Sequence, residues 1–164
     1  MATLYETGQG VERNSQEAVR LFRLAAEQGA VSAQAALGEI YEFGQGVPVD
    51  LNQAVAWYRQ AAEKGDADSA AQVGRILIIG EGIDQNIDEA VKFLTLAADK
   101  GNTDAQFNLA GLYASGIGVK RDLRKAYSLF TLAGKKLDVS KQLDEISSKL
   151  EREGSASQVS RLQQ

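Results

Sequence analysis

Four Gly-x-Gly pairs are the part of this sequence closest to a chemical motif. They lie at Gly8/Gly10, Gly44/Gly46, Gly80/Gly82 and Gly116/Gly118. A dinucleotide-binding fingerprint needs a third glycine three residues further on, placed after a strand and at the start of a helix. The residues found at that place are Arg13, Val49, Gln85 and Arg121. Helical patterns, not strand patterns, precede the pairs, so the sequence argues against a nucleotide-binding site.

The glycine pairs instead mark an internal repeat with a constant period of 36 residues. An alanine pair follows the same period as Ala25-Ala26, Ala61-Ala62 and Ala97-Ala98, and becomes Ala133-Gly134. A self-similar unit of this length is typical of a solenoid, in which each unit buries its apolar face against its neighbours. We expect the glycines to end one helix and turn the chain toward the next, with a positive φ at Gly46.

Each unit predicts two helices, which we call the A helix and the B helix. In the second unit the A helix is expected over residues 32–43, ended by Gly44. Its apolar face holds Ala33, Leu37, Ile40 and Tyr41. Asp50 is the expected N-cap of the B helix, with Gln53 completing a capping box. The buried face of the B helix is expected to hold Ala54, Tyr58, Ala61 and Ala62.

The capping box is expected to recur in the first and third units and to fail in the fourth. Asn14 with Glu17 and Asn86 with Glu89 repeat it, whereas Asp122 is followed by Lys125. Trp57 aligns with apolar residues in the other units, which favours core packing over ligand stacking.

Composition excludes several classes of function. The 164 residues carry a net charge of −4 with both signs interspersed, so we expect neither a nucleic-acid partner nor attraction to a membrane surface. The chain has no cysteine and no histidine, which removes Cys/His metal sites and every Ser-His or Cys-His catalytic arrangement. We therefore expect no catalytic residue, no cofactor and no metal. No apolar run is long enough for a membrane span.

The start of the sequence falls inside a repeat, because Tyr5 aligns with Tyr41 and Tyr113. We expect the first unit to be partial and the chain to be a fragment of a longer one. The compartment stays open: periplasmic if the parent chain carries a signal peptide, and cytoplasmic otherwise.

The second unit is similar to the Sel1-like repeat (SLR) family, which is related to the tetratricopeptide repeat. The matching residues are Ala33, Leu37, Gly38, Tyr41, Gly44, Gly46, Val47, Asp50, Ala54, Trp57, Tyr58, Ala61, Ala62 and Gly65. The third unit departs most, with Leu77 in place of tyrosine and Phe93-Leu94 in place of Trp-Tyr. The resemblance implies an all-α fold: a right-handed α/α superhelix of stacked helix-turn-helix repeats that acts as an adaptor or scaffold for other proteins.

The repeat pattern ends near residue 136. We expect one partial and three complete units over 1–136, a C-terminal capping helix over 137–153 and a polar tail over 154–164. Leu143, Ile146 and Leu150 form the apolar stripe of the expected cap.

Large apolar residues that break the repeat on the A helices are the candidate protein-binding residues. They are Phe43, Ile78, Ile79 and Phe107. The helical pattern places them away from the core stripe, so we expect them to form an exposed patch. Packing against loops or the tail helix is the alternative.

The leading hypothesis is a non-enzymatic scaffold that binds a protein or peptide partner on one face of the solenoid. A structural spacer, or an arm that self-associates through the first repeat, is a second hypothesis. A hydrolytic enzyme is a third, because cysteine-rich relatives in the SLR family have been discussed as penicillin-binding or hydrolytic. The chain has no Ser-x-x-Lys motif, which argues against the third.

Overall fold

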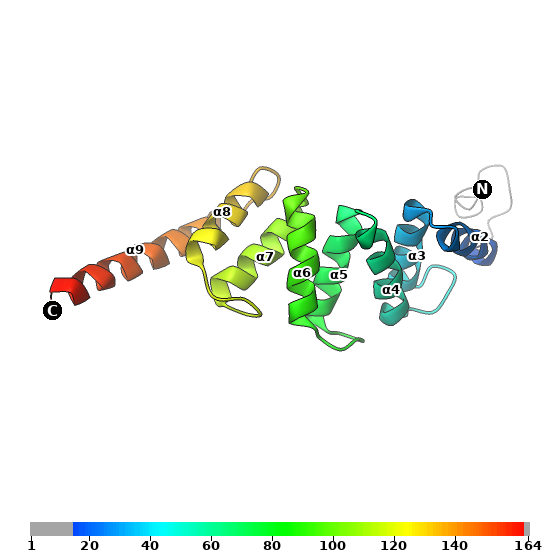
Figure 1. Ribbon diagram of the computed structural model, residues 1–164, viewed down its shortest axis with the longest axis horizontal. Coiled ribbons are helices and arrows are strands. Elements are labelled where there is room, and N and C mark those ends of the chain that lie inside the picture. Colours follow the sequence, from blue (N-terminus) through cyan, green and yellow to red (C-terminus); the bar gives the residue numbers. More distant parts are fainter. Residues whose placement is uncertain (1–14, 163–164) are drawn as a thin grey trace.

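The computed structural model describes residues 15–162, and all regular structure in that range is helical. The helices follow one another in a single extended row, and α9 projects from its C-terminal end (Figure 1). Their bounds are α2 Ser15–Glu27, α3 Val31–Phe43, α4 Leu51–Glu63, α5 Ala67–Ile79, α6 Ile87–Asp99, α7 Thr103–Ser115, α8 Leu123–Ala133 and α9 Ser140–Leu162. The odd-numbered helices α3, α5 and α7 are A helices, and the even-numbered ones are B helices. The all-α fold is therefore confirmed.

Part of the first unit lies outside the described residues. This concerns the glycine pair Gly8/Gly10, the aligned Tyr5 and the expected cap Asn14. The description of the repeats therefore begins with the B helix α2.

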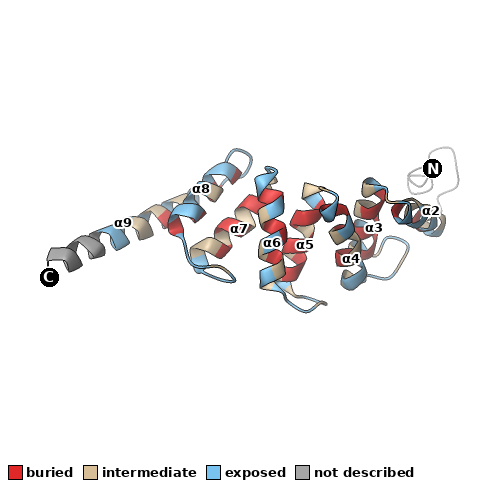
Figure 2. Cartoon of the chain, viewed as in Figure 1, coloured by how far each residue is buried: buried red, intermediate tan, exposed pale blue. Residues whose placement is uncertain are grey.

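The apolar faces expected in the second unit are buried as predicted. On α3 these are Ala33, Leu37, Ile40 and Tyr41, and on α4 they are Ala54, Tyr58, Ala61 and Ala62. Figure 2 shows buried residues continuing along the row of helices. Trp57 is partly buried and packs against the same core, which confirms its expected packing role. Each unit thus buries its apolar stripe against the neighbouring helices.

Two glycines inside A helices allow the B helix of the same unit to pack closely. A Cβ added to Gly74 would lie 2.5 Å from Leu94 Cγ and 3.3 Å from the carbonyl oxygen of Ala90. Gly38 makes the equivalent approach to the ring of Tyr58. A larger residue at either glycine would have to push the two helices apart.

Each glycine of a Gly-x-Gly pair has a separate structural role. Gly44 ends α3 in the left-handed region with φ of 70°, and its N–H donates to the carbonyl of Ile40. Gly46 has φ of 80°, as expected. It also lies against the first residue of the preceding B helix, since a Cβ there would be 2.6 Å from Ser15 Cβ. Gly82 and Gly118 occupy the same place against the first residues of α4 and α6.

We predict that Gly46→Val lowers the free energy of unfolding by more than about 1 kcal/mol, because valine is strongly disfavoured at positive φ and would collide with α2. Gly82→Val is the matched control. It has a similar φ of 76°, but the nearest atom to its added Cβ is Leu51 Cδ1 at 3.4 Å. Urea denaturation should show a larger loss at Gly46. An unchanged midpoint for Gly46→Val would contradict the prediction.

The N-caps of the B helices differ from the expected capping box. Asp50 Oδ1 accepts from the N–H of Gln53 at 3.0 Å, and Asp122 Oδ1 accepts from the N–H of Lys125 at 2.9 Å. The N–H of Asp50 donates to the carbonyl of Tyr41, so the Gln53 side chain is not needed for it. Asp122 thus caps its helix although Lys125 cannot complete a capping box, because the carbonyl of Tyr113 accepts from the N–H of Asp122, as the carbonyl of Leu77 accepts from that of Asn86.

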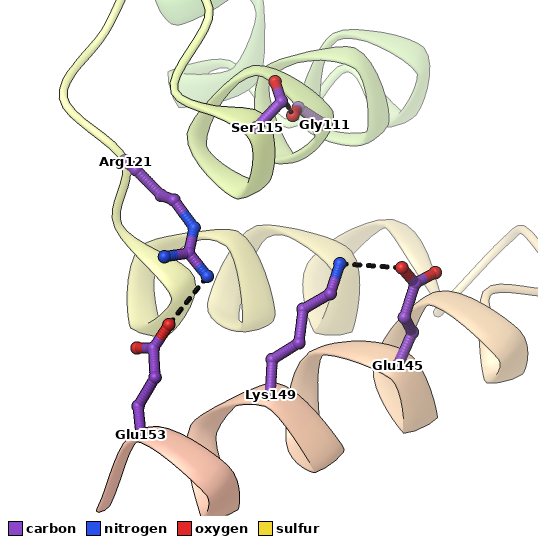
Figure 3. A network of polar contacts seen from close by, with 6 residues as sticks. All are labelled: Gly111, Ser115, Arg121, Glu145, Lys149 and Glu153. Carbon is purple, nitrogen blue, oxygen red and sulfur yellow. Dashed lines mark hydrogen bonds and ion pairs between the residues drawn. The ribbon is translucent and has the colours of Figure 1, made fainter. Parts of the chain in front are cut away.

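The last repeat is covered by α9. Val139, just before α9, and Ile146, within it, are buried against α8, and Leu143 and Leu150 pack around them. Arg121 pairs with Glu153 at 2.7 Å, which links α9 to the segment before α8 (Figure 3). The helix continues to Leu162, across the boundary expected between the cap and the polar tail.

Candidate interaction surface

Phe43 and Ile79 are the most exposed of the four predicted binding residues. They close α3 and α5, respectively, and they occupy the same position of successive repeats. Their side chains are 61% and 50% exposed. Equivalent positions of stacked units lie on the same face of a solenoid. The two residues therefore form an apolar edge on that face. Neither side chain is part of the core.

Ile78 and Phe107 are less exposed than expected, and for these two the expectation of free exposure is wrong. Ile78 is partly buried and packs against the main core. Phe107 is partly buried against the ring of Phe130, with ring centroids 5.4 Å apart and planes at 74°. The alternative of packing within the fold thus applies to part of each side chain.

The surroundings of Glu42, which occupies the same repeat position as Ile78, show that this position packs inward. Glu42 forms a polar cluster with Tyr58 and Arg75. Glu42 stands one repeat before Ile78, and its side chain is only 8% exposed. It pairs with Arg75 of α5 and accepts a hydrogen bond from Tyr58 Oη of α4 at 2.9 Å. Burial, and then the hydrogen bond to Glu42, raise the pKa of Tyr58, so its hydroxyl stays protonated as a donor.

This position of the A helix therefore faces the next repeat and not solvent. In the third unit, Ile78 and Leu94 occupy the places of Glu42 and Tyr58; Leu94 belongs to the main core and Ile78 packs against it.

Two adjoining cavities form an open groove over the A helices α3, α5 and α7. The cavity between α3 and α5 has a volume of about 440 Å³ and includes Phe43 in its lining. The cavity between α5 and α7 has a volume of about 380 Å³ and includes Phe107. Asp68 and Gln72 of α5 line both, which makes the groove continuous across the three helices. We call this feature the A-helix groove.

The lining of the A-helix groove follows a helical stripe. Of the residues predicted from the sequence to bind a partner, only Phe107 belongs to it. The stripe runs through the second, fifth, sixth and ninth residues of each A helix: Ser32, Ala35, Ala36 and Glu39; Asp68, Ala71, Gln72 and Arg75; Asp104, Phe107, Asn108 and Gly111. All of these except Gly111 line the two cavities. The signal was present as variation in charge and polarity between repeats at positions spaced i, i+3, i+4 and i+7.

The described residues contain neither a group of side chains suited to a metal ion nor a helix suited to a membrane span. No group of three or more acidic side chains within the described range is placed to hold a metal ion. No helix in that range is both long and apolar enough to cross a membrane.

The stacked helical pairs and the groove along them define a helical-repeat solenoid with an open face. The chain belongs to the Sel1 repeat family, whose model matches residues 1–29, 31–66, 67–102 and 103–136. Sel1 repeat proteins are generally scaffolds for protein interactions. No curated protein matches the chain in sequence.

Solved bacterial structures share the fold. A protective antigen of uropathogenic Escherichia coli strains with an SLR fold is 36% identical, with a TM-score of 0.78 over 82% of this chain. A Sel1 repeat protein from Oxalobacter formigenes is 34% identical, with a TM-score of 0.74 over 85% of this chain. The chain spans 29% and 57% of the lengths of these two proteins. Cysteine-rich protein B of Helicobacter pylori is 15% identical with a TM-score of 0.60 and shares the fold alone.

Proposed function

We propose that this chain is a non-enzymatic scaffold that binds a segment of a protein partner in the A-helix groove. The observation that carries the proposal is the continuous groove over α3, α5 and α7, which is lined by the exposed Phe43 and the partly exposed Phe107. Solenoids expose such extended surfaces because each unit uses only its two flanks for stacking.

The four residues expected from the sequence take different parts in this proposal. Phe43 and Phe107 line the groove in neighbouring cavities, and Ile79 extends the apolar edge that Phe43 begins. Ile78 supports the packing of α5 more than the surface. Exposed apolar side chains in a concave setting are typical anchors for a partner.

Removing the exposed anchors is expected to weaken partner capture without unfolding the chain. Phe43→Ser combined with Ile79→Ser should weaken retention of a specific protein at least about tenfold, since truncated interface anchors commonly cost about 2 kcal/mol or more. The melting curve should stay nearly in place because neither side chain is in the core. The measurement is quantitative protein capture from a native lysate by the immobilised chain.

Leu96→Ser is the matched control, because Leu96 is a partly exposed apolar residue on the B helix α6, outside the groove. We expect the unmodified chain and Leu96→Ser to retain the same proteins. The double variant should lose them. Equal capture by all three proteins would refute the A-helix groove as the binding surface and favour a spacer role.

A further inference from the structure

The A-helix groove carries a one-sided charge that points to the chemistry of its occupant. Four carboxylates line it or its rim: Glu39, Asp66, Asp68 and Asp104. Among the described residues lining the two cavities the one cation is Arg75, and the carboxylate of Glu42 pairs with it. The groove is therefore acidic although the chain as a whole is only mildly so.

The carboxylates retain capacity to accept further hydrogen bonds. Asp66 Oδ1 accepts from the N–H of Ser69 and Asp68 Oδ1 accepts from Asn102 Nδ2, each at 2.7 Å. Each bond engages one oxygen, and a carboxylate has about four acceptor sites in all. Asp68 and Asp104 are exposed at the second residue of their helices. An incoming ammonium or guanidinium group would find open partners at both.

Two lysines lie beside the groove but do not form ion pairs with Asp68 or Asp104. Lys100 and Lys136 line an adjacent cavity together with Asp68 and Asp104. Lys100 Nζ donates to the carbonyl of Gly65 at 2.8 Å. Among the described residues no ion pair joins either lysine to Asp68 or Asp104.

The groove also offers aromatic and amide groups. Phe107 shows part of its ring to the cavity between α5 and α7, and Phe43 stands in the cavity between α3 and α5. Such rings can pack against an apolar side chain or lie beneath a guanidinium group. Gln72 and Asn108 also line the groove, and their side-chain amides can form hydrogen bonds with a peptide backbone.

The length of the groove suits a short extended segment. Packed helices lie about 8–10 Å apart, so three successive A helices span on the order of 20 Å. An extended chain rises about 3.3 Å per residue, which gives about six residues across the groove.

We propose that the A-helix groove binds an extended, basic segment of a protein partner, with Lys or Arg at the carboxylates and an apolar or aromatic residue beside Phe107. This inference rests on the proposed function and adds the chemistry of the partner. Charge complementarity selects this occupant, because carboxylates repel acidic segments and the phosphates of nucleic acids.

The test uses random peptides of about 12 residues displayed on phage and selected against the full chain, a length about twice that of the groove. Enriched sequences should carry a net positive charge and an aromatic or large apolar residue. A synthetic, fluorescein-labelled peptide of the enriched sequence is then titrated by fluorescence anisotropy. Its Kd should rise several-fold between about 50 mM and about 500 mM NaCl, because salt screens exposed charges.

Paired substitutions assign the effect to the groove. Asp68→Asn with Asp104→Asn should raise the Kd at least about tenfold, because both changes keep shape and remove charge. Asp88→Asn is the matched control. Asp88 is exposed at the second residue of α6, as Asp104 is in α7, but it lies outside the groove. It should leave the Kd unchanged, and melting curves of all variants check the fold.

Other outcomes separate this inference from the proposed function. Enriched peptides that are neutral or acidic, and that lose binding with Phe43→Ser and Ile79→Ser but not with the aspartate variants, would overturn the basic partner while leaving the groove as a binding site. Failure to select any peptide weakened by the aspartate variants would also overturn it. Protein capture by the unmodified chain remains an independent measure of the proposed function.

Discussion

Replacing Leu94 with alanine is expected to lower the free energy of unfolding by about 2–5 kcal/mol. Leu94 is fully buried in α6 and fills the space beside Gly74 of α5. Truncating it removes packing between the two helices of the third unit and leaves a cavity that the stacked neighbours cannot close. Urea and thermal denaturation of the two proteins measure the loss. A change within about 0.5 kcal/mol, as is usual for surface positions, would contradict this account of the core.

Gly74→Ala in both backgrounds provides the control. Alanine should stabilise an α-helix interior by about 1 kcal/mol relative to glycine. In the unmodified chain its Cβ would lie 2.5 Å from Leu94 Cγ, so the substitution should destabilise instead. In the Leu94→Ala background the contact with Cγ is removed and only the carbonyl oxygen of Ala90, at 3.3 Å, stays close, so the loss caused by Gly74→Ala should become smaller. Gly111→Ala in α7 should stabilise in either background, because nothing lies within 4 Å of its added Cβ.

A chain that ends at Gly134 is expected to aggregate or to lose about 3–6 kcal/mol of stability. Val139 and Ile146 are each only 3% exposed in the full chain, and burying a side chain of this size contributes about 1.5–3 kcal/mol. Removing them would uncover the apolar flank of α8, including Phe130 and Ala133. Light scattering and thermal denaturation measure the two effects.

A chain that ends at Gly154 is the matched truncation. It retains Leu143, Ile146 and Leu150, together with the ion pair between Arg121 and Glu153. Its melting temperature should match that of the full chain. If the chain ending at Gly134 stays monomeric and equally stable, α9 is not a cap for the repeats.

The repeat fold could be predicted from the sequence because one unit is copied with a fixed period. The core residues Leu37, Ile40 and Tyr58, the cap Asp50 and the positive φ of Gly46 all follow from local patterns, and each is confirmed. Local sequence rules are sufficient where the role of a residue depends mainly on its own helix or turn.

The predictions of exposure failed where a side chain is covered by a neighbouring helix or repeat. A helical wheel treats the position of Glu42 and Ile78 as outward, yet the following B helix and the next A helix cover it. Phe107 is likewise partly covered by Phe130 of α8. Contacts between units depend on how the units stack, which a wheel of one helix does not contain. The acidic lining of the groove has the same origin, because Glu39, Asp68 and Asp104 come from three different A helices.

The spacing of the contacts between units has a consequence for synthesis of the chain. Lys64 reaches the carbonyl of Gly29 and Lys100 reaches that of Gly65, each at 2.8 Å and across 35 positions of sequence. Gly46 and Gly82 lie as close in sequence to the helices they touch. Closing segments of this length costs little chain entropy, and no strand must wait for a distant partner. Each unit can therefore dock on its predecessor soon after leaving the ribosome, so that the array grows in the order of translation.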